Sequence, residues 1–453
     1  MPSRRDQTYP SGESMPRITI GKFSVTLAAV AAFAACTTAS AFTKPPFPRI
    51  AGVQIGSPFN YNDATYQANL AKQSVMILGM YPGMAPGGQS MNAQIQAIKA
   101  KNPNALVFLY TQSDDGNPSE SSGSWGTFVS KMTSMKWWLY TDKPLTQSVA
   151  SVAGSGDFTI NNSLFTPKDS DGNLAVDWIA KFYANTYYKA NPAIDGFFQD
   201  NTFIKPNVDG DWNRDGKIDS RSDPQTGTWF RQGYQRYYKQ IAALMPGKYQ
   251  IGNIGDWADN GAIPPEYKSL VNGGVMEGYI GKSYSVEGWG GWQAMMTRYN
   301  AIMANFLEPK LGIFNQWGDA TDYQGMRYGL TSALMNDGYY SFTDNSKQYY
   351  GVTWFDEFDS KLGQSSSLPP TAAWKSGIWR RDFENGIALV NPKGNGTKTI
   401  TLDGTYVKIK GTQDPVTNNG QAVTTVTLKD RDGIILLRQN PVKRPAAPKL
   451  TQN

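Results

Sequence analysis

Three observations in the sequence predict a (β/α)8 TIM barrel followed by a small C-terminal all-β sandwich domain. Eight short apolar runs are rich in residues that favour strands, and most of them are separated by amphipathic helical patterns. Parallel strands covered on both faces read as continuous apolar runs, and eight of them can close a barrel. After residue 364 the helical patterns stop and closely spaced strand-like pieces follow. A doubly wound sheet is the competing architecture for the first part.

The expected strands alternate with helices along the chain. Helical spacing places Met91, Ile95 and Ile98 on one face, and similar patterns occur near residues 228–245 and 292–306. The segment 112–193 is long for a connection, so we expect helices of its own and a lid-like excursion there. The eight strands are expected at residues 50–56, 74–80, 105–111, 194–200, 249–255, 273–279, 311–317 and 337–343.

The N-terminal stretch has the layout of a secretory signal. A short basic flank with Arg17 and Lys22 precedes an apolar core, and Ala39-Ser40-Ala41 follows it. We therefore expect a signal peptide over 1–41, a barrel over 42–364, and a β-sandwich domain with a solvated tail over 365–453. The expected location is secreted or periplasmic, without a membrane span. A lipoprotein anchor at Cys36, the sole cysteine, is the alternative.

Composition limits the chemistry. The chain of 453 residues contains no histidine, which excludes Ser-His-Asp and Cys-His catalysis and histidine-ligated metals. Acid-base work is left to carboxylates, lysine or tyrosine. The formal net charge of +6 is mild and does not indicate a nucleic-acid partner.

Acids, amides and aromatic residues follow several of the expected strands. In a barrel these positions form the functional end, and such a mixture suits a sugar, whose ring stacks on aromatic faces and whose hydroxyls bind amides and carboxylates. Trp257, Trp289 and Trp317 lie in contexts where exposure is expected, whereas Trp229, Trp292 and Trp354 fit helical packing. The expected substrate-binding residues are Asn201, Asn253, Asp256, Trp257, Tyr279, Gln316, Trp317, Asp319 and Asp344.

Two of the strand-end acids are the candidate catalytic pair. Glycosidic cleavage needs two carboxyl groups on either side of the scissile bond. Asp200 is expected to be the nucleophile, or the base if the enzyme inverts. Glu277 follows an apolar run, which is expected to raise its pKa and suit it to general acid duty. The alternative for each is a structural role, either capping a helix or pairing with an arginine such as Arg298 or Arg327.

The stretch "DWNRDGKIDSRSD" after the fourth strand matches nine positions of an EF-hand-type calcium loop. Position twelve is Ser222, where a bidentate glutamate is expected, so the ligand set is incomplete. A bare loop of Asx turns is the alternative. Any calcium here would staple the loop, and no cofactor is needed for the chemistry. The expected ligands are Asp211, Asn213, Asp215, Lys217 and Asp219.

Three passages carry a resemblance to a known group. They are "IDGFFQDN", "GGVMEGY", and "WFDEFDSKLGQ" leading into "WRRDFENGIALVNP". Over roughly residues 48–440 the chain resembles secreted bacterial glycoside hydrolases of the (β/α)8 type and, more remotely, the endo-α-1,4-polygalactosaminidase family. The resemblance implies a nucleophile at Asp200 and an acid/base at Glu277.

The combined prediction is a monomeric glycoside hydrolase that cleaves a polysaccharide or oligosaccharide with two carboxylates, by a retaining mechanism. The rival is a non-catalytic carbohydrate-binding protein on a degenerate barrel, in which the same acids only bind hydroxyls. A third hypothesis is that the protein is an adhesin that binds through residues 365–453.

Overall fold

The structure is a computed structural model that describes residues 42–56, 61–79, 90–151 and 156–439. The expected signal segment 1–41 lies outside the described residues, and so does Cys36. The same holds for Met80 at the end of the expected second strand and for the expected tail from residue 440.

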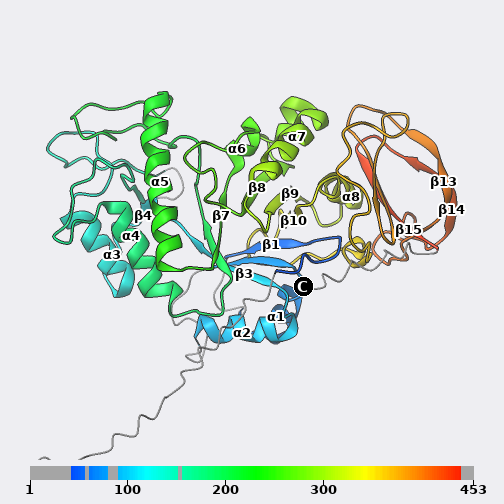
Figure 1. Ribbon diagram of the computed structural model, residues 1–453, viewed down its shortest axis with the longest axis horizontal. Coiled ribbons are helices and arrows are strands. Elements are labelled where there is room, and N and C mark those ends of the chain that lie inside the picture. Colours follow the sequence, from blue (N-terminus) through cyan, green and yellow to red (C-terminus); the bar gives the residue numbers. More distant parts are fainter. Residues whose placement is uncertain (1–41, 57–60, 80–89, 152–155, 440–453) are drawn as a thin grey trace, which may run out of the picture. The chain divides into compact units, whose positions relative to one another are not determined.

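Eight parallel strands form the barrel (Figure 1). They follow one another around the sheet in the order β1-β2-β3-β6-β7-β8-β9-β10, and a parallel bridge between Ile50 and Tyr340 joins the first to the last. The barrel is therefore nearly closed, which confirms the predicted fold class. The strands are β1 (Ala51–Gln54), β2 (Val75–Leu78), β3 (Leu106–Thr111), β6 (Gly196–Gln199), β7 (Tyr249–Asn253), β8 (Gly273–Ile280), β9 (Leu311–Gly318) and β10 (Tyr339–Asp344).

Helices occur between the strands where the apolar spacing predicts them. The side chains of Met91, Ile95 and Ile98 are all buried, as the helical spacing requires. The longest helix begins at Pro224 behind the cap Asp223, whose side chain accepts from Gln225 N, a favourable start for a helix. The helices are α1 (Ala64–Leu70), α2 (Met91–Lys101), α5 (Pro224–Leu244), α6 (Gly255–Asn260), α7 (Val286–Asn305) and α8 (Tyr323–Leu334).

The long connection between β3 and β6 contains secondary structure of its own. An aromatic cluster stabilises this connection. The ring centroids of Phe128 and Phe182 lie 5.2 Å apart, and Trp178 stacks on Phe182. The prediction of helices in this connection is confirmed. Its elements are β4 (Asp115–Gly116), α3 (Gly123–Ser134), β5 (Phe158–Thr159), α4 (Ala175–Tyr183) and the π-helix η2 (Ala184–Tyr188).

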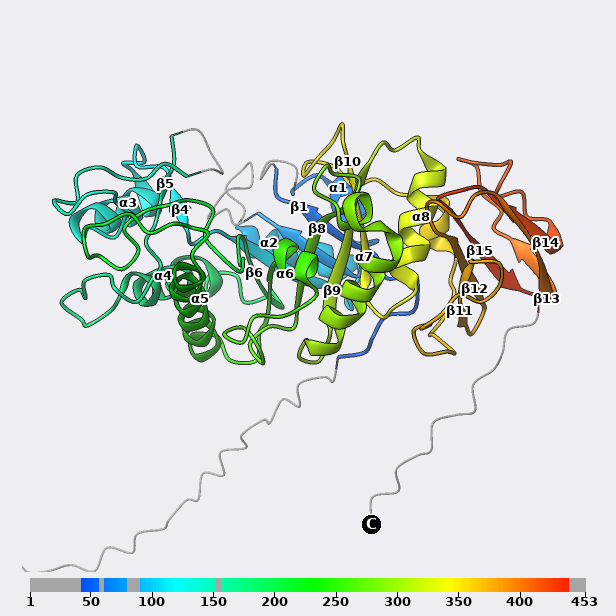
Figure 2. The same cartoon turned by 90° about the horizontal axis from the view of Figure 1, so that it is seen from above.

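The C-terminal part is all-β, as predicted, but its described strands form one antiparallel sheet and not two facing sheets. The strand order is β11-β12-β15-β13-β14, and the sheet packs against α8 (Figure 2). A short 3-10 helix, η3 (Asp356–Asp359), precedes it. The strands are β11 (Trp379–Phe383), β12 (Gly386–Asn391), β13 (Lys398–Lys408), β14 (Ala422–Leu428) and β15 (Asp432–Arg438).

A buried arginine links the barrel to this sheet. Arg327 of α8 is only 5% exposed, and its guanidinium lies 2.6 Å from Asp414, 3.6 Å from Asp432 and 3.7 Å from Glu357. Such a charge is tolerated in the interior only with partners of this kind. The barrel and the sheet belong to one compact unit that begins at Thr43.

Within the described part of the chain, the helices are too short or too polar for any of them to span a membrane.

Candidate active site

Asp200 follows directly after β6, inside the end of the barrel. Its Oδ2 accepts a hydrogen bond of 2.5 Å from the Tyr110 hydroxyl, and its Oδ1 accepts one of 2.9 Å from Asn201 N. Burial raises the pKa of Asp200. The hydrogen bonds from Tyr110 and Asn201 lower this pKa, and the nearby charge of Glu277 raises it further.

Glu277 is turned toward the same place by an irregularity in β8. The pairing of β8 with β9 shifts register between Met276 and Ile280, and Gly278 has a φ of 60°, which glycine adopts without strain. The Glu277 carboxylate accepts hydrogen bonds from the Tyr349 hydroxyl (2.6 Å) and from Asn253 Nδ2 (3.0 Å). Two polar side chains therefore surround this carboxylate, where the sequence analysis expected an apolar environment.

The two acids line one cavity of about 100 Å³ at the centre of this end of the barrel. Asn253 Nδ2 donates to Glu277, and the Asn253 side chain is also near enough to Asp200 to lower the pKa of that acid. Among the described residues, neither acid has a lysine or arginine within ion-pair distance, so the alternative of an ion pair with Arg298 or Arg327 is not what the structure shows. The cavity is lined by Val53, Ile55, Tyr110, Phe198, Asp200, Asn253, Val275, Glu277, Asn315 and Tyr349.

Two tyrosines of this cavity were not identified from the sequence. Burial and the neighbouring charge of Asp200 raise the pKa of Tyr110, and burial and the charge of Glu277 raise the pKa of Tyr349. Both hydroxyls therefore stay protonated and donate to the carboxylates. Tyr110 lies in the third strand and could have been found from its inward position, whereas Tyr349 lies in the loop after β10, where no periodic signal exists.

A third acid, Asp114, lies next to the pair and was also missed. Asn201, which has a φ of 51°, donates from Nδ2 to Asp114 Oδ1 at 3.3 Å, while its backbone N–H binds Asp200. Burial, followed by the charges of Asp115 and Asp200, raises the pKa of Asp114. The pair of aspartates in "SDD" after the third strand was the available signal.

Three of the expected substrate-binding residues point away from the cavity, which corrects the prediction. Trp257 is fully buried and stacks on Tyr267 at 4.7 Å. Tyr279 packs against Phe314, and its hydroxyl donates to backbone carbonyls in the helix layer. Gln316 is buried and donates to the carbonyl of Gly325 in α8. These side chains lie between the barrel strands and the surrounding helices.

Three expected acids lie on the outer rim of the barrel end, outside the lining of the cavity. Asp256 accepts from Ile204 N at 2.7 Å, and burial raises its pKa to about 7. Burial of Asp344 is outweighed by hydrogen bonds from Ser346, so its pKa is lowered. Asp319 is exposed and accepts from Asn345. Hydrogen bonds from neighbouring groups hold the first two, so their role is structural.

The tryptophans that were expected to be exposed differ in their actual exposure. Trp317 is 7% exposed, lies 5.5 Å from the Tyr349 ring, and carries the Lys282 ammonium 3.4 Å from its ring centroid. It supports the cavity without lining it. Trp289 is 58% exposed and lies under Arg298. Exposure is confirmed for Trp289 and is wrong for Trp257 and Trp317.

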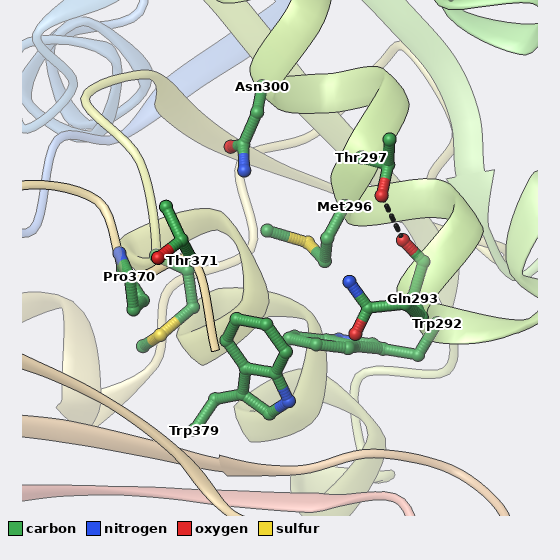
Figure 3. A pocket seen from close by; sticks show the side chains of 9 residues that line it. Trp292, Gln293, Met296, Thr297, Asn300, Pro370, Thr371 and Trp379 are labelled. Carbon is green, nitrogen blue, oxygen red and sulfur yellow. Dashed lines mark hydrogen bonds between the residues drawn. The ribbon is translucent and has the colours of Figure 1, made fainter. Parts of the chain in front are cut away.

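A larger cavity of about 190 Å³ lies at α7, beside residues 370 and 371 (Figure 3). Trp292 and Trp379 lie 5.0 Å apart there, and Thr297 donates to the carbonyl of Gln293. None of the residues that line it is acidic or basic: Trp292, Gln293, Met296, Thr297, Asn300, Met335, Pro370, Thr371 and Trp379. It has no group for acid-base catalysis, so the smaller central cavity is the candidate active site.

Comparison with solved structures finds matches at low identity. The glycoside hydrolase domain of PelA from Pseudomonas aeruginosa is 12% identical over 68% of this chain and 99% of its own, with a TM-score of 0.41. The GH36 α-galactosidase AgaA from Geobacillus stearothermophilus is 12% identical over 88% of this chain and 56% of its own (TM-score 0.44). Eubacterium rectale Amy13B is 9% identical over 88% and 97%, respectively (TM-score 0.48).

No curated protein matches the chain. One family model does match, that of Hypothetical glycosyl hydrolase family 15, over residues 172–387. This stretch begins before β6 and ends within β12, so it includes both Asp200 and Glu277. The match to Hypothetical glycosyl hydrolase family 15 thus covers strands β6 to β10 of the nearly closed parallel barrel.

Proposed function

We propose that this protein hydrolyses glycosidic bonds of a polysaccharide or oligosaccharide with the carboxyl groups of Asp200 and Glu277. The observation that carries the proposal is that these two acids line one cavity together with Asn253, which donates to Glu277. The match to a glycosyl hydrolase family over the stretch that contains both acids supports it.

We propose a retaining mechanism. Carboxyl groups about 5 to 5.5 Å apart are typical of retaining enzymes, whereas inverting enzymes need about 6.5 to 9.5 Å to place a water. The two acids line one cavity of about 100 Å³, and the charge of Glu277 raises the pKa of Asp200. This nearness favours the shorter class.

In the proposed reaction the Asp200 carboxylate attacks the anomeric carbon while Glu277 gives its proton to the departing glycosidic oxygen. A water then attacks the glycosyl ester, gives a proton to Glu277 and releases Asp200. Tyr110 and Tyr349 orient the two carboxyl groups through the hydrogen bonds described above. Asp200 must be ionised to attack, and its burial works against this in the free protein.

The opposite assignment, with Asp200 as general acid, has the raised pKa of Asp200 in its favour. Chemical rescue distinguishes the two. Azide should restore turnover of an activated glycoside by the Asp200→Gly variant, and the product should have inverted configuration at the anomeric carbon. The same product from Glu277→Gly, with no rescue of Asp200→Gly, would reverse the roles.

The activity itself is tested on a panel of polysaccharides by measuring reducing ends with the wild type and with Glu277→Gln. We expect release by the wild type and a large loss in the variant. Binding by both proteins without release from either would support the rival, a carbohydrate-binding protein without catalysis.

We also propose that the protein acts outside the cytoplasm, on the strength of the signal-like sequence over residues 1–41. Fractionation of cells that express the full chain tests this. Recovery of the full-length chain in the cytoplasmic fraction alone would contradict it.

A further inference from the structure

The loop from Asp211 to Asp219 lies between β6 and α5 and plays no part in the proposed hydrolysis. We propose that it binds a calcium ion, which fixes this loop against the connection between β3 and β6. The proposal does not depend on the hydrolytic function.

The backbone of the loop already has the course of a calcium loop. Asp211 Oδ2 accepts from Gly216 N, Asn213 Oδ1 from Asp215 N, and Asp215 Oδ1 from Lys217 N, each at 2.9 Å. Gly216, at the sixth position, has a φ of 90°, as the sharp turn of such loops requires. The side chains at positions one, three and five each bind a backbone N–H of the turn.

An oxygen of Asp211 gives the independent reason to expect a cation. Asp211 is only 1% exposed, and its Oδ1 is buried and has no hydrogen-bond partner within the described residues. A buried carboxylate oxygen without a partner is costly and calls for an explanation such as an ion. The other oxygen of the same group binds Gly216 N at the sixth position, so this carboxylate is held by the loop itself.

Arg214 lies close enough for its charge to interact with that of Asp211. Its Nη2 donates to the carbonyls of Lys136 (2.6 Å) and Trp138 (3.1 Å), whereas its Nε and Nη1 are buried without a hydrogen-bond partner among the described residues. Within the described ranges, no lysine or arginine lies within ion-pair distance of Asp211. The free oxygen is therefore available to a metal ion.

Two features set the expected strength of binding. In the described part of the chain, no three Asp, Glu, His or Cys side chains converge in metal-binding geometry, so the acids must move inward on binding. Calcium loops also use oxygens that do not belong to acids. In this loop they are the side-chain oxygen of Asn213 and the backbone carbonyl of Lys217. The twelfth position is Ser222, and the next residue, Asp223, already caps α5. We expect a dissociation constant of about 10⁻⁴ to 10⁻³ M, the range of weak extracellular sites.

The chemistry of the loop selects calcium. All available ligands are oxygens in an irregular arrangement, which calcium accepts and which magnesium, with its strict octahedron, does not. Trp212 is buried against Phe230 of α5, and Asn161 Nδ2 donates to the carbonyls of Asp211 and Trp212. An ion here would fix α5 and the β3–β6 connection to one another.

The test uses the full chain and two readouts that need no substrate. Calcium at about 10 mM, at least ten times the expected dissociation constant, should raise the unfolding midpoint by about 2 to 4 °C relative to chelator. Terbium should give luminescence sensitised by Trp212, and calcium, but not magnesium, should displace it.

Asp215→Ala is the informative variant, because Asp215 is exposed and its loss should not prevent folding. We expect it to abolish both the shift in midpoint and the terbium signal. Asp171→Ala, which removes an exposed acid from another loop, is the matched control and should keep both. Absence of a calcium effect on the wild type, or an equal effect on Asp215→Ala, would overturn the proposal.

Discussion

The centre and the outer rim of one barrel end contain the same kinds of residue in different surroundings. At the centre, side-chain hydroxyl and amide groups from Tyr110, Tyr349 and Asn253 bind the two acids beside a cavity, and Asn201 N also donates to Asp200. On the rim, Ile204 N donates to Asp256, and the backbone N–H and hydroxyl of Ser346 donate to Asp344. An acid that lines a cavity can exchange partners with a substrate, whereas an acid held by its neighbours outside the cavity is part of the fold.

The largest effects are expected from neutralising acids in the two regions. Asp200→Asn and Glu277→Gln should each lower kcat/KM by about 10³-fold or more, because each removes a group that takes part in bond cleavage. Asp319→Asn, on the exposed rim, should stay within about twofold of the wild type. Steady-state kinetics on the best substrate of the panel measures this. A comparable loss in Asp319→Asn would erase the distinction between centre and rim.

The second test concerns the two tryptophans that were both expected to be exposed. Trp257→Ala should lower the free energy of unfolding by about 3 to 5 kcal/mol, because it leaves a cavity beside Tyr267. Trp289→Ala should change it by about 0.5 kcal/mol or less, since this side chain is mostly in solvent. Denaturant unfolding measures both. Unchanged stability of Trp257→Ala together with a higher KM would return this residue to the binding surface.

A third test uses the pKa of about 7 at Asp256, which burial raises from the ordinary value of about 3.9. The folded state then binds this proton more tightly than the unfolded state. Stability is therefore highest below pH 4, falls as the pH rises to about 7, and is level above that. After allowance for the partial exposure of Asp256, we expect the free energy of unfolding to fall by about 2 to 3 kcal/mol over this pH range.

Asp256→Asn should flatten this fall, as unfolding measured between pH 4 and 8 would show. The stability of the variant should still depend on pH to some extent, because burial raises the pKa of Asp259 to about 6. In the wild type, the charge of Lys205 lowers the pKa of Asp256 and so opposes the effect of burial. An unaltered pH profile in the variant would assign the effect to other groups.

The smallest expected effect comes from a hydroxyl at the centre. Tyr349→Phe removes one hydrogen bond from Glu277, and kcat should fall about tenfold with little change in KM. Tyr350→Phe is the matched control, because the neighbouring ring is exposed. Equal kinetics for both variants would mean that the hydroxyl of Tyr349 does not orient the acid.

Sequence periodicity was sufficient for the barrel strands, because each is buried on both faces and stands out as an apolar run. It was not sufficient for the side on which a strand-end residue lies. Glu277 and Tyr279 are two positions apart and would share a face in a regular strand. The register shift at Gly278 places them on opposite sides, and nothing in the letters alone shows that shift.

A similar limit applies to β9 and to the loop after β10. Asn315 lines the cavity and Gln316 faces α8, so choosing between neighbouring amides requires the register of the strand. Tyr349 reaches Glu277 from a loop 72 positions away in the chain, a contact that no local pattern encodes. The acids themselves could be found because a carboxylate after a buried run is unusual.

The buried guanidinium of Arg327 has a consequence for protein engineering. Its counter-charges at Asp414 and Asp432 belong to the C-terminal sheet, while the arginine belongs to the barrel. A fusion that exchanged the sheet for a foreign domain would leave the charge of Arg327 without these partners, on an apolar helix α8 that the sheet no longer covers. The domain boundary near residue 364 is therefore a poor site for joining a foreign domain. We expect the barrel and the sheet to have been inherited together.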